Sequence, residues 1–376
     1  MTPTTPDVAT RPVAPSVPRL SRRRLGLLTT AAYHLAPASA PVARGADTPR
    51  PIRIGQIGVG HGHATKLAVY RASPDYEVLG IVEPDEGLRR AAEDKAPFAG
   101  LAWMPRDELL ALPGLDAVLV ESRVDDLLDH AEAAVAAGRH VHVDKPAGTS
   151  LPRLRRLLAS AAARGLLVQI GYMYRYNPAV LLLHEFLRAG WLGDVFEVHA
   201  VMSKLVGDAE RDTLGAQPGG TMFELGCHLI DLVVAILGPP RRVTAFPRHS
   251  GLRDDGLLDN MLAVLEYRRA TATIRTSVIE VEGWSRRQLT VCGTEGTFHL
   301  QPLDDPAVRL SLSRARGGHP AGTSTVTFPA FHRYVADALD MARIVRGGKR
   351  PDFDAAHDLA VQEAVLVASG LASATP

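Results

Sequence analysis

The sequence is poor in cysteine, carries almost no net charge and has no long hydrophobic run. Only Cys227 and Cys292 occur among its 376 residues, and neither has a second thiol at CxxC spacing, which argues against a disulfide framework or a thiolate zinc site. No apolar run is long enough for a membrane span. The 46% hydrophobic and 22% charged residues are typical of a globular enzyme and exclude a mainly disordered chain.

The net charge of +1 is unevenly distributed along the chain. Residues 1–50 contain seven arginines against Asp7 and Asp47, a net charge of +5, so the remaining residues carry −4. Because residues 51–376 are mildly acidic, they provide no positive electrostatic potential that would attract a phosphate backbone. Nucleic acid is therefore not an expected partner.

The first fifty residues resemble an export signal followed by a linker. Prolines lead into SRRRLGLL at 21–28, in which Arg22 and Arg23 form a twin-arginine pair, and a modestly apolar stretch with small residues follows. A flexible basic tail, or a start codon placed too far upstream, is the alternative. We expect residues 1–50 to direct twin-arginine export to the periplasm, and a cytoplasmic location if they do not.

From Pro51 onward, short apolar runs alternate with helical patterns. Strands are predicted at 52–58, 77–82, 115–122, 139–145 and 166–172, and helices at 64–72, 86–95, 125–137 and 152–164. Strands joined by single helices form right-handed βαβ units and a parallel sheet. Residues 51–171 are therefore predicted to be a doubly wound α/β domain of the Rossmann type.

After Tyr172 the pattern changes to strands separated by turns. Strand candidates lie at 193–204, 260–269, 270–280 and 287–300, and helical spacing returns from Phe331 to Ala374. Residues 172–376 are predicted to be an α+β domain with an open-faced, mostly antiparallel sheet and C-terminal helices that pack on the body. A chain of this length suits two domains better than a single core.

The turn after the first strand, IGVGHGHATK at 57–66, begins like a dinucleotide-binding loop. Gly58 and Gly60 stand where a backbone must bend tightly and approach a pyrophosphate without a side chain. Glu83 ends the second predicted strand 25 residues after Gly58, where its carboxylate can accept hydrogen bonds from both ribose hydroxyls and repel a 2′-phosphate. We therefore expect NAD as cofactor, with NADP less favoured.

Two histidines distinguish this turn from the usual fingerprint. His63 occupies the position of the third glycine. Gly62 and Ala64 on either side are small residues, which allow the start of the helix to pack closely. Both His61 and His63 are predicted to be helix-start residues that face solvent or phosphate.

Three further stretches follow in order: HVHVDKP at 140–146, GYMYRYNP at 171–178 and GGTMFELGCHLIDLV at 219–233. Together with the nucleotide turn, this ordered set resembles the family of glucose–fructose oxidoreductase, inositol dehydrogenase and the rhizopine catabolism protein (Gfo/Idh/MocA), from Ile52 to about Leu371. The resemblance implies a Rossmann domain followed by an open-faced sheet domain that commonly forms the oligomer interface. We therefore expect a homodimer or homotetramer.

The resemblance also implies catalytic residues. Lys145 matches the lysine of the family's Glu-Lys-Pro motif, with Asp144 in place of the glutamate. His228 matches the family's catalytic histidine, and Glu224 stands where an aspartate is usual. The predicted cofactor contacts are Gly58, Gly60, His61, Gly62, His63, Glu83 and Lys145.

The residue types support these roles. Glu224, His228 and Asp231 lie at i, i+4 and i+7 and share one helix face, where a carboxylate beside an imidazole raises its pKa and fixes its tautomer. Lys145 lies at the carboxyl end of a parallel strand, where such sheets bind ligands, and its ammonium can stabilise a developing alkoxide. Without the surrounding motifs, a solvated lysine and a packed helix histidine would be the simpler interpretations.

Other polar residues near these motifs are candidates for substrate contact. Arg175, Tyr176, Asn177 and Asp231 are predicted to bind substrate, with support of the crossing chain as an equal alternative for Arg175 and Asn177. Glu121, which follows the third strand, either alters substrate choice or caps the next helix.

A metal site is a further interpretation of the histidines and carboxylates. The available nitrogen and oxygen ligands are His61, His63, Glu224, His228 and Asp231. We predict no metal, because the histidine pair and the helix lie on different elements and the nucleotide turn accounts for the pair.

These observations predict an NAD-dependent oxidoreductase that acts on a sugar or polyol. His228, oriented by Glu224, would remove the hydroxyl proton while Lys145 steadies the oxyanion. Two alternatives share the fold: a glycosidase that oxidises its sugar transiently, and a non-catalytic sugar or nucleotide sensor, against which Lys145 and His228 argue. Export of a nucleotide-dependent enzyme further predicts that the cofactor stays bound through each cycle.

Overall fold

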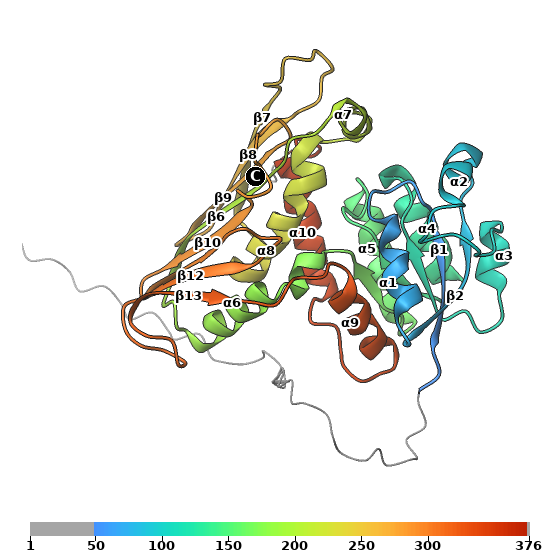
Figure 1. Cartoon of the computed structure of the whole chain (residues 1–376), viewed down its shortest axis with the longest axis horizontal. Coiled ribbons are helices and arrows are strands. Elements are labelled where there is room, and N and C mark those ends of the chain that lie inside the picture. The colour runs from blue at the N-terminus through green and yellow to red at the C-terminus, as the bar shows by residue number, and fades with distance from the viewer. Residues whose placement is uncertain (1–48, 374–376) are drawn as a thin grey trace, which may run out of the picture. The chain divides into compact units, whose positions relative to one another are not determined.

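Two sheets of different type organise residues 49–373, the part of the chain that the computed structural model describes (Figure 1). The expected export signal falls in residues 1–48 and lies outside the described residues. Among the residues that are described, no helix is long and apolar enough to cross a membrane.

The first sheet is parallel throughout, as predicted. In spatial order its strands are β2 (Tyr76–Val82), β1 (Ile52–Ile57), β3 (Ala117–Val120), β4 (His140–Val143) and β5 (Val168–Ile170). Its helices are η1 (Ala64–Lys66), α1 (Leu67–Ala72), α2 (Glu86–Ala92), α3 (Arg106–Ala111), α4 (Val124–Ala136) and α5 (Leu151–Ala163). The sequence patterns predicted all of these elements except α3.

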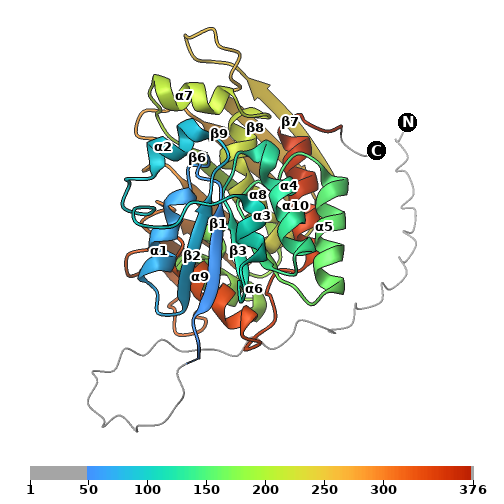
Figure 2. The same ribbon diagram turned by 90° about the vertical axis from the view of Figure 1, so that its right-hand side faces the viewer.

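Helices cover both faces of this parallel sheet (Figure 2). Val118 and Val120 of β3 belong to the apolar cluster that contains α4 and α5, whereas Leu119 belongs to the cluster that contains α1. Because successive strand residues point to opposite faces, a strand buried on both sides needs apolar residues at every position. All four residues of β3 are buried, which confirms the doubly wound architecture.

The second sheet has eight strands and is mostly antiparallel, with β6 and β9 as its parallel pair. In spatial order the strands are β13 (Gly322–Thr327), β12 (Ala307–Leu312), β11 (Gly296–Leu300), β10 (Gln288–Gly293), β6 (Val195–Ser203), β9 (Thr271–Ser277), β8 (Asn260–Glu266) and β7 (Arg242–Arg248). Helices α8 and α10 lie on one face (Figure 1), and no helix of residues 49–373 covers the other face. That open face is the surface expected to pair in an oligomer, which stays a prediction.

Seven helical segments accompany the second sheet. They are η2 (Met173–Tyr176), α6 (Pro178–Ala189), α7 (Asp208–Gly215), the π-helix η3 (Met222–Gly226), α8 (Cys227–Leu237), α9 (Val335–Val345) and α10 (Ala355–Ala368). The expectation that turns alone separate these strands was wrong, because α7, η3 and α8 lie between β6 and β7. The proposed domain boundary at 171/172 falls between β5 and η2.

The two C-terminal helices join the sheets. Helix α9 packs on the parallel-sheet side, where Tyr76 donates a hydrogen bond of 2.6 Å from its hydroxyl to the Ala338 carbonyl. Helix α10 packs against both α8 and α5, and Gln362 donates a hydrogen bond of 2.7 Å to the Gly148 carbonyl. These contacts hold the carboxyl edge of the parallel sheet next to η3 and α8, where the candidate site lies.

Candidate active site

The turn after β1 is tight enough to require glycine at its first position. Gly58 has a φ of +93°, and a Cβ added there would lie 2.4 Å from the backbone N and Cα of Ser122. No other residue tolerates both the left-handed backbone and this close approach. Gly58 therefore brings the turn directly over the end of β3, the position in which dinucleotide-binding loops cradle a pyrophosphate.

Glu83 connects this turn to a cavity beside it. One carboxylate oxygen accepts a hydrogen bond of 2.8 Å from the Val59 backbone N–H, and the other accepts one of 3.0 Å from the Asp85 backbone N–H. The adjoining cavity has a volume of about 510 Å³ and is lined by Val82, Glu83, Pro84, Arg89, Trp103, Met104, Pro105, Arg106, Asp107 and His130. Its size and mixed lining fit an adenosine.

Two features of this cavity were not predicted from the sequence. Arg89 lies over the Trp103 ring at 5.7 Å, and Arg106 lines the same space. Arginine is well suited to a 2′-phosphate, whereas Glu83 opposes one. The preference for NAD over NADP therefore depends on which charge lies closer to the ribose, and it stays a prediction.

Lys145 and Glu224 form the centre of the site. Lys145 follows the carboxyl end of β4, is 1% exposed, and donates hydrogen bonds of 2.6 Å to Glu224 Oε1 and 2.8 Å to the Glu224 carbonyl. Burial, the largest single influence, acts to lower the pKa of Lys145, but the neighbouring acidic groups, Glu224 foremost, together outweigh burial and raise the pKa. Burial, the largest single influence, acts to raise the pKa of Glu224, but Lys145, His61 and His63 together outweigh burial and lower the pKa to about 2. The two side chains are therefore a charged pair at neutral pH.

This pairing corrects the expected role of Glu224. The i, i+4 spacing predicted that the Glu224 carboxylate lies beside His228. In the structure the carboxylate instead faces Lys145, and Glu224 forms no hydrogen bond with His228. The physical reason is that a buried carboxylate gains more from an ammonium than from a neutral imidazole. Glu224 also belongs to a π-helical turn, a local irregularity that is frequent at functional sites.

His228 lies in an aromatic pocket, 3% exposed. Its ring is edge-on to Tyr174, with 5.2 Å between centroids, and to Tyr172, with 6.0 Å. Burial, reinforced by the Lys145 charge, holds the pKa of His228 well below its usual range. The imidazole is therefore neutral, and its Nδ1 has no hydrogen-bond partner among the described residues.

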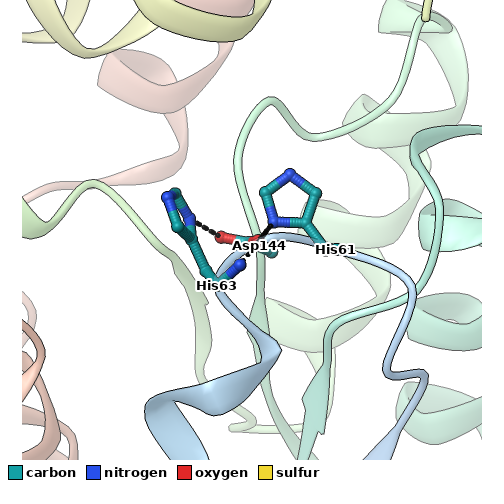
Figure 3. A group of neighbouring side chains, drawn as sticks. All are labelled: His61, His63 and Asp144. Carbon is teal, nitrogen blue, oxygen red and sulfur yellow. Dashed lines mark hydrogen bonds and ion pairs between the residues drawn. The ribbon is translucent and has the colours of Figure 1, made fainter. Parts of the chain in front are cut away.

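His61 is buried and His63 half-buried, so the expectation that they face solvent was wrong for His61, while a contact of either residue with phosphate stays a prediction. Both approach Asp144 at the end of β4 (Figure 3): His61 Nδ1 forms an ion pair with Oδ2, and His63 Nδ1 lies 3.2 Å from Oδ1. Burial alone would lower the pKa of His61, but Asp144 and Glu224 raise it to about 9. Burial dominates at His63 and lowers its pKa to about 4.

Behind Asp144 lies a second buried lysine that the sequence analysis missed. Lys66 is 1% exposed, and its ammonium lies 2.9 Å from Glu121 Oε1, 3.3 Å from Asp144 Oδ1 and 3.1 Å from His142 Nε2. Burial, strengthened by the Asp144 charge, raises the pKa of Glu121 to about 8. Glu121 is therefore a buried partner of Lys66, and the expectation that it caps the next helix was wrong. The only sequence signal for this group was a lysine within an otherwise apolar helix start.

The four predicted substrate contacts are all bonded to the protein itself. Arg175 donates hydrogen bonds to Asp231 at 2.6 Å and to Asp358 at 2.7 Å, both buried. The Tyr176 hydroxyl donates to Asp340 at 2.9 Å, and Asn177 caps α6 while it donates to the Leu303 carbonyl at 2.8 Å. These bonds give the residues a supporting role, and a direct substrate contact stays a prediction.

Known proteins share this combination of sheets and motifs. Residues 52–172 match the model of the GFO/IDH/MocA oxidoreductase family with an NAD-binding Rossmann fold, and residues 180–299 match the GFO/IDH/MocA C-terminal domain. D-xylose 1-dehydrogenase (NADP(+)) 2 of Haloferax volcanii is 28% identical over 318 residues, which cover 83% of this chain and 94% of that protein. Inositol 2-dehydrogenase of Gluconacetobacter diazotrophicus is 27% identical over 296 residues, which cover 77% and 84% respectively.

Solved structures share the fold. An oxidoreductase from Agrobacterium radiobacter, in complex with NAD+, L-tartaric acid and magnesium, superposes with a TM-score of 0.73 at 17% identity over 86% of this chain and 96% of that one. The 3-ketoreductase KijD10 from Actinomadura kijaniata, a K102A mutant in complex with TDP-benzene and NADP, superposes with a TM-score of 0.68 at 22% identity over 84% and 96%. At such identities the similarity establishes the architecture alone.

Proposed function

The chain belongs to the GFO/IDH/MocA family and is an NAD(P)-dependent oxidoreductase, and we propose that its substrate is a sugar or polyol and its cofactor NAD. The two relatives named as dehydrogenases of xylose and of inositol support the substrate class. The observation that carries the proposal is the charged Lys145–Glu224 pair next to a neutral, unpartnered His228.

Each of these three residues has a distinct proposed role. His228 is a neutral base whose free ring nitrogen can accept the proton of a substrate hydroxyl. Lys145 presents a fixed positive charge to the oxygen as it becomes negative. Glu224 positions the Lys145 ammonium, since it bonds to Lys145 through both a carboxylate oxygen and its carbonyl.

The turn and Glu83 would hold the cofactor. Gly58 and Gly60 leave the backbone of the turn open to a pyrophosphate, and Glu83 lies at the edge of the cavity that fits adenosine. A nicotinamide, when bound, exchanges a hydride with the substrate carbon. The rest of the chemistry, binding the hydroxyl and moving its proton, belongs to Lys145 and His228.

A substrate panel tests this proposal. The protein is incubated with NAD or NADP and with sugars, polyols and aryl glycosides, and products are identified by mass. We expect an oxidised sugar or polyol together with reduced cofactor. Release of an aglycone without net oxidation would instead identify the redox-assisted glycosidase. Cofactor binding without any product from the panel would favour the sensor.

A further inference from the structure

We propose that the histidine pair of the nucleotide turn, together with Glu224, forms a binding site for a divalent metal ion, with Asp144 beneath the pair as the carboxylate that orients it. No metal was predicted from the sequence, because the histidine pair and the helix of Glu224 lie on different elements and the nucleotide turn accounted for the pair. The fold overturns the first reason. His61, His63 and Asp144 each offer a ligand atom within 4.8 Å of the others (Figure 3), and His61 Nε2 lies 3.8 Å from Glu224 Oε2.

Asp144 fixes the orientation of both imidazoles. The Nδ1 atoms of His61 and His63 both face its carboxylate, and the second nitrogen of each ring points away from it (Figure 3). A carboxylate that binds one ring nitrogen sets the tautomer that leaves the other nitrogen free for a metal, which is the usual arrangement behind metal-binding histidines. One aspartate here serves two histidines.

A separate observation identifies Glu224 as a further candidate ligand next to His61. His61 Nε2 and Glu224 Oε2 are both buried, neither has a hydrogen-bond partner within residues 49–373, and they lie 3.8 Å apart. That distance is too long for a hydrogen bond. It is within the span of two ligand atoms that share one cation, because bonds to zinc from histidine and carboxylate are each about 2.1 Å long. Lys145 occupies only the other oxygen of Glu224, so Oε2 remains available.

The charges around the site also favour a cation. Two ammonium groups lie in this part of the structure, those of Lys66 and Lys145. Four buried or half-buried carboxylates surround them: Glu121, Asp144, Glu224 and Asp337. Because the raised pKa of Glu121 keeps it protonated at neutral pH, this group carries a formal charge of −1 when the histidines are neutral. Uncompensated buried negative charge is costly, and a cation bound beside His61 would offset it.

The donor set indicates the class of metal. Two imidazoles and a carboxylate suit Zn²⁺ and neighbouring first-row ions, and they leave a coordination position open. The His63 ring lies 6.1 Å from the His228 ring, so the open position adjoins the proposed base. A substrate oxygen bound there would be polarised by the ion. Metal binding does not depend on the proposed function. A role of the metal in the reaction does rest on the proposed function.

Metal titration of the full chain tests the site. Protein prepared without a histidine tag is stripped with a chelator, and then titrated with Zn²⁺ by calorimetry and with Co²⁺ by visible absorption. We expect one ion per chain, retained after desalting and counted by elemental mass spectrometry. His61→Ala, His63→Ala and Glu224→Gln should each weaken binding at least about 10-fold. His299→Ala, on β11 and bonded to Thr290, is the matched control and should bind as the native protein does.

The outcomes separate this proposal from the proposed function. Circular dichroism and an NAD titration on the same samples establish that each variant is folded. Loss of the ion in folded, NAD-binding variants supports the site, and one bound ion in a protein without dehydrogenase activity supports the site while it contradicts the proposed function. No retained ion in the native protein, or equal weakening in His299→Ala, overturns the site whatever the activity. The buried charge would then be balanced by a protonated His61 or by the cationic nicotinamide.

Discussion

At the scale of single residues, Lys145 and His228 carry the proposed chemistry. Lys145→Ala and His228→Ala should each lower turnover at least about 100-fold, because each removes an oxyanion-stabilising or proton-accepting group. NAD binding should persist, since the turn and Glu83 are untouched. Steady-state turnover and a cofactor titration check both statements.

The control for this pair is another helix histidine. His184 in α6 is half-buried, its buried Nε2 has no partner among the described residues, and burial lowers its pKa, but it belongs to no proposed step. His184→Ala should keep native turnover. If either Lys145→Ala or His228→Ala behaves in the same way, that residue has a structural role only.

Glu83 decides the predicted cofactor preference. Glu83→Ala removes the carboxylate that repels a 2′-phosphate, while Arg89 and Arg106 remain in the cavity. NADP affinity should therefore rise about 10-fold relative to NAD, which is about 1.4 kcal/mol. Dissociation constants for both nucleotides measure the change, with Glu86→Ala, exposed at the start of α2, as the charge-matched control. Equal affinities in the native protein would contradict the role of Glu83.

The sequence motifs predicted which residues gather at the candidate site better than which partners those residues bond. The motifs identified Lys145, Glu224 and His228, and the fold brings all three to one edge of the parallel sheet. The spacing within one helix predicted a bond between Glu224 and His228. In the structure Glu224 bonds instead to Lys145, which lies on another element. Likewise, nothing in the local pattern of the turn indicates that His61 reaches Asp144, because that contact crosses from β1 to the end of β4.

At the scale of elements, a buried ion pair ties α8 to the segment that crosses between the sheets. Asp231 of α8 accepts hydrogen bonds from Arg175 and lies 3.0 Å from His357 Nε2 of α10. Asp231→Ala leaves the Arg175 charge partly unpaired and should lower the free energy of unfolding by about 3 kcal/mol or more. Glu86→Ala, which breaks the exposed pair with Arg90 on α2, should cost less than about 1 kcal/mol.

Denaturant unfolding measures both variants, and kinetics distinguishes support from substrate contact. If Asp231 only supports the fold, the folded fraction of Asp231→Ala keeps the native KM. A raised KM in a variant of native stability would instead identify Asp231 as a substrate ligand, as the sequence analysis predicted.

The start of α9 holds a non-glycine residue in the left-handed region. Tyr334 has a φ of +69°, and its ring lies 5.7 Å from the His63 ring and 5.3 Å from the Lys66 ammonium. The backbone conformation costs any residue with a Cβ roughly 1 kcal/mol. Tyr334→Gly should therefore be about 1 kcal/mol more stable than Tyr334→Ala, the reverse of their order inside a helix. Thermal unfolding of the two variants compares them, and a more stable alanine variant would show that position 334 is unstrained.

Elements were predictable where hydrophobic periodicity was strong. The strands of the parallel sheet and helices α4 and α5 followed from apolar runs and helical spacing. Strand β13, GTSTVT, was not predicted because it is largely exposed and polar. Strand β7 was not predicted because Pro247 interrupts it at the edge of the sheet. Strand β12, AVRLSL, does alternate apolar and polar residues, so its signal was present in the sequence.

At the scale of the whole molecule, the site exists only where the two sheets meet. The nucleotide turn and Lys145 belong to the parallel sheet, whereas Glu224 and His228 come from the helices on the second sheet. The contacts of α10 with α8 and α5 hold these parts together. Neither half alone contains both the proposed base and the cofactor turn, so a fragment ending near residue 172 should bind nucleotide without catalysis.

The last prediction connects the N-terminus to this assembled site. Twin-arginine export carries proteins already folded, often with the cofactor in place, and the space beyond the membrane has no dependable pool of free NAD. An exported dehydrogenase that released its reduced cofactor would therefore stop after one turnover. We expect the protein to purify with nicotinamide nucleotide bound and to turn over without added NAD, either by oxidising one sugar and reducing another or by a redox-neutral cycle.

Two measurements check the connection separately. Nucleotide released on denaturation should approach one equivalent per chain, and a reporter fused to residues 1–50 should be exported, whereas the same fusion with Arg22→Lys and Arg23→Lys should remain inside. A nucleotide-free protein that works only with stoichiometric NAD would contradict retention. A native fusion that stays in the cytoplasm would remove the reason for retention, because free NAD is plentiful there and the dinucleotide could then exchange at every turnover.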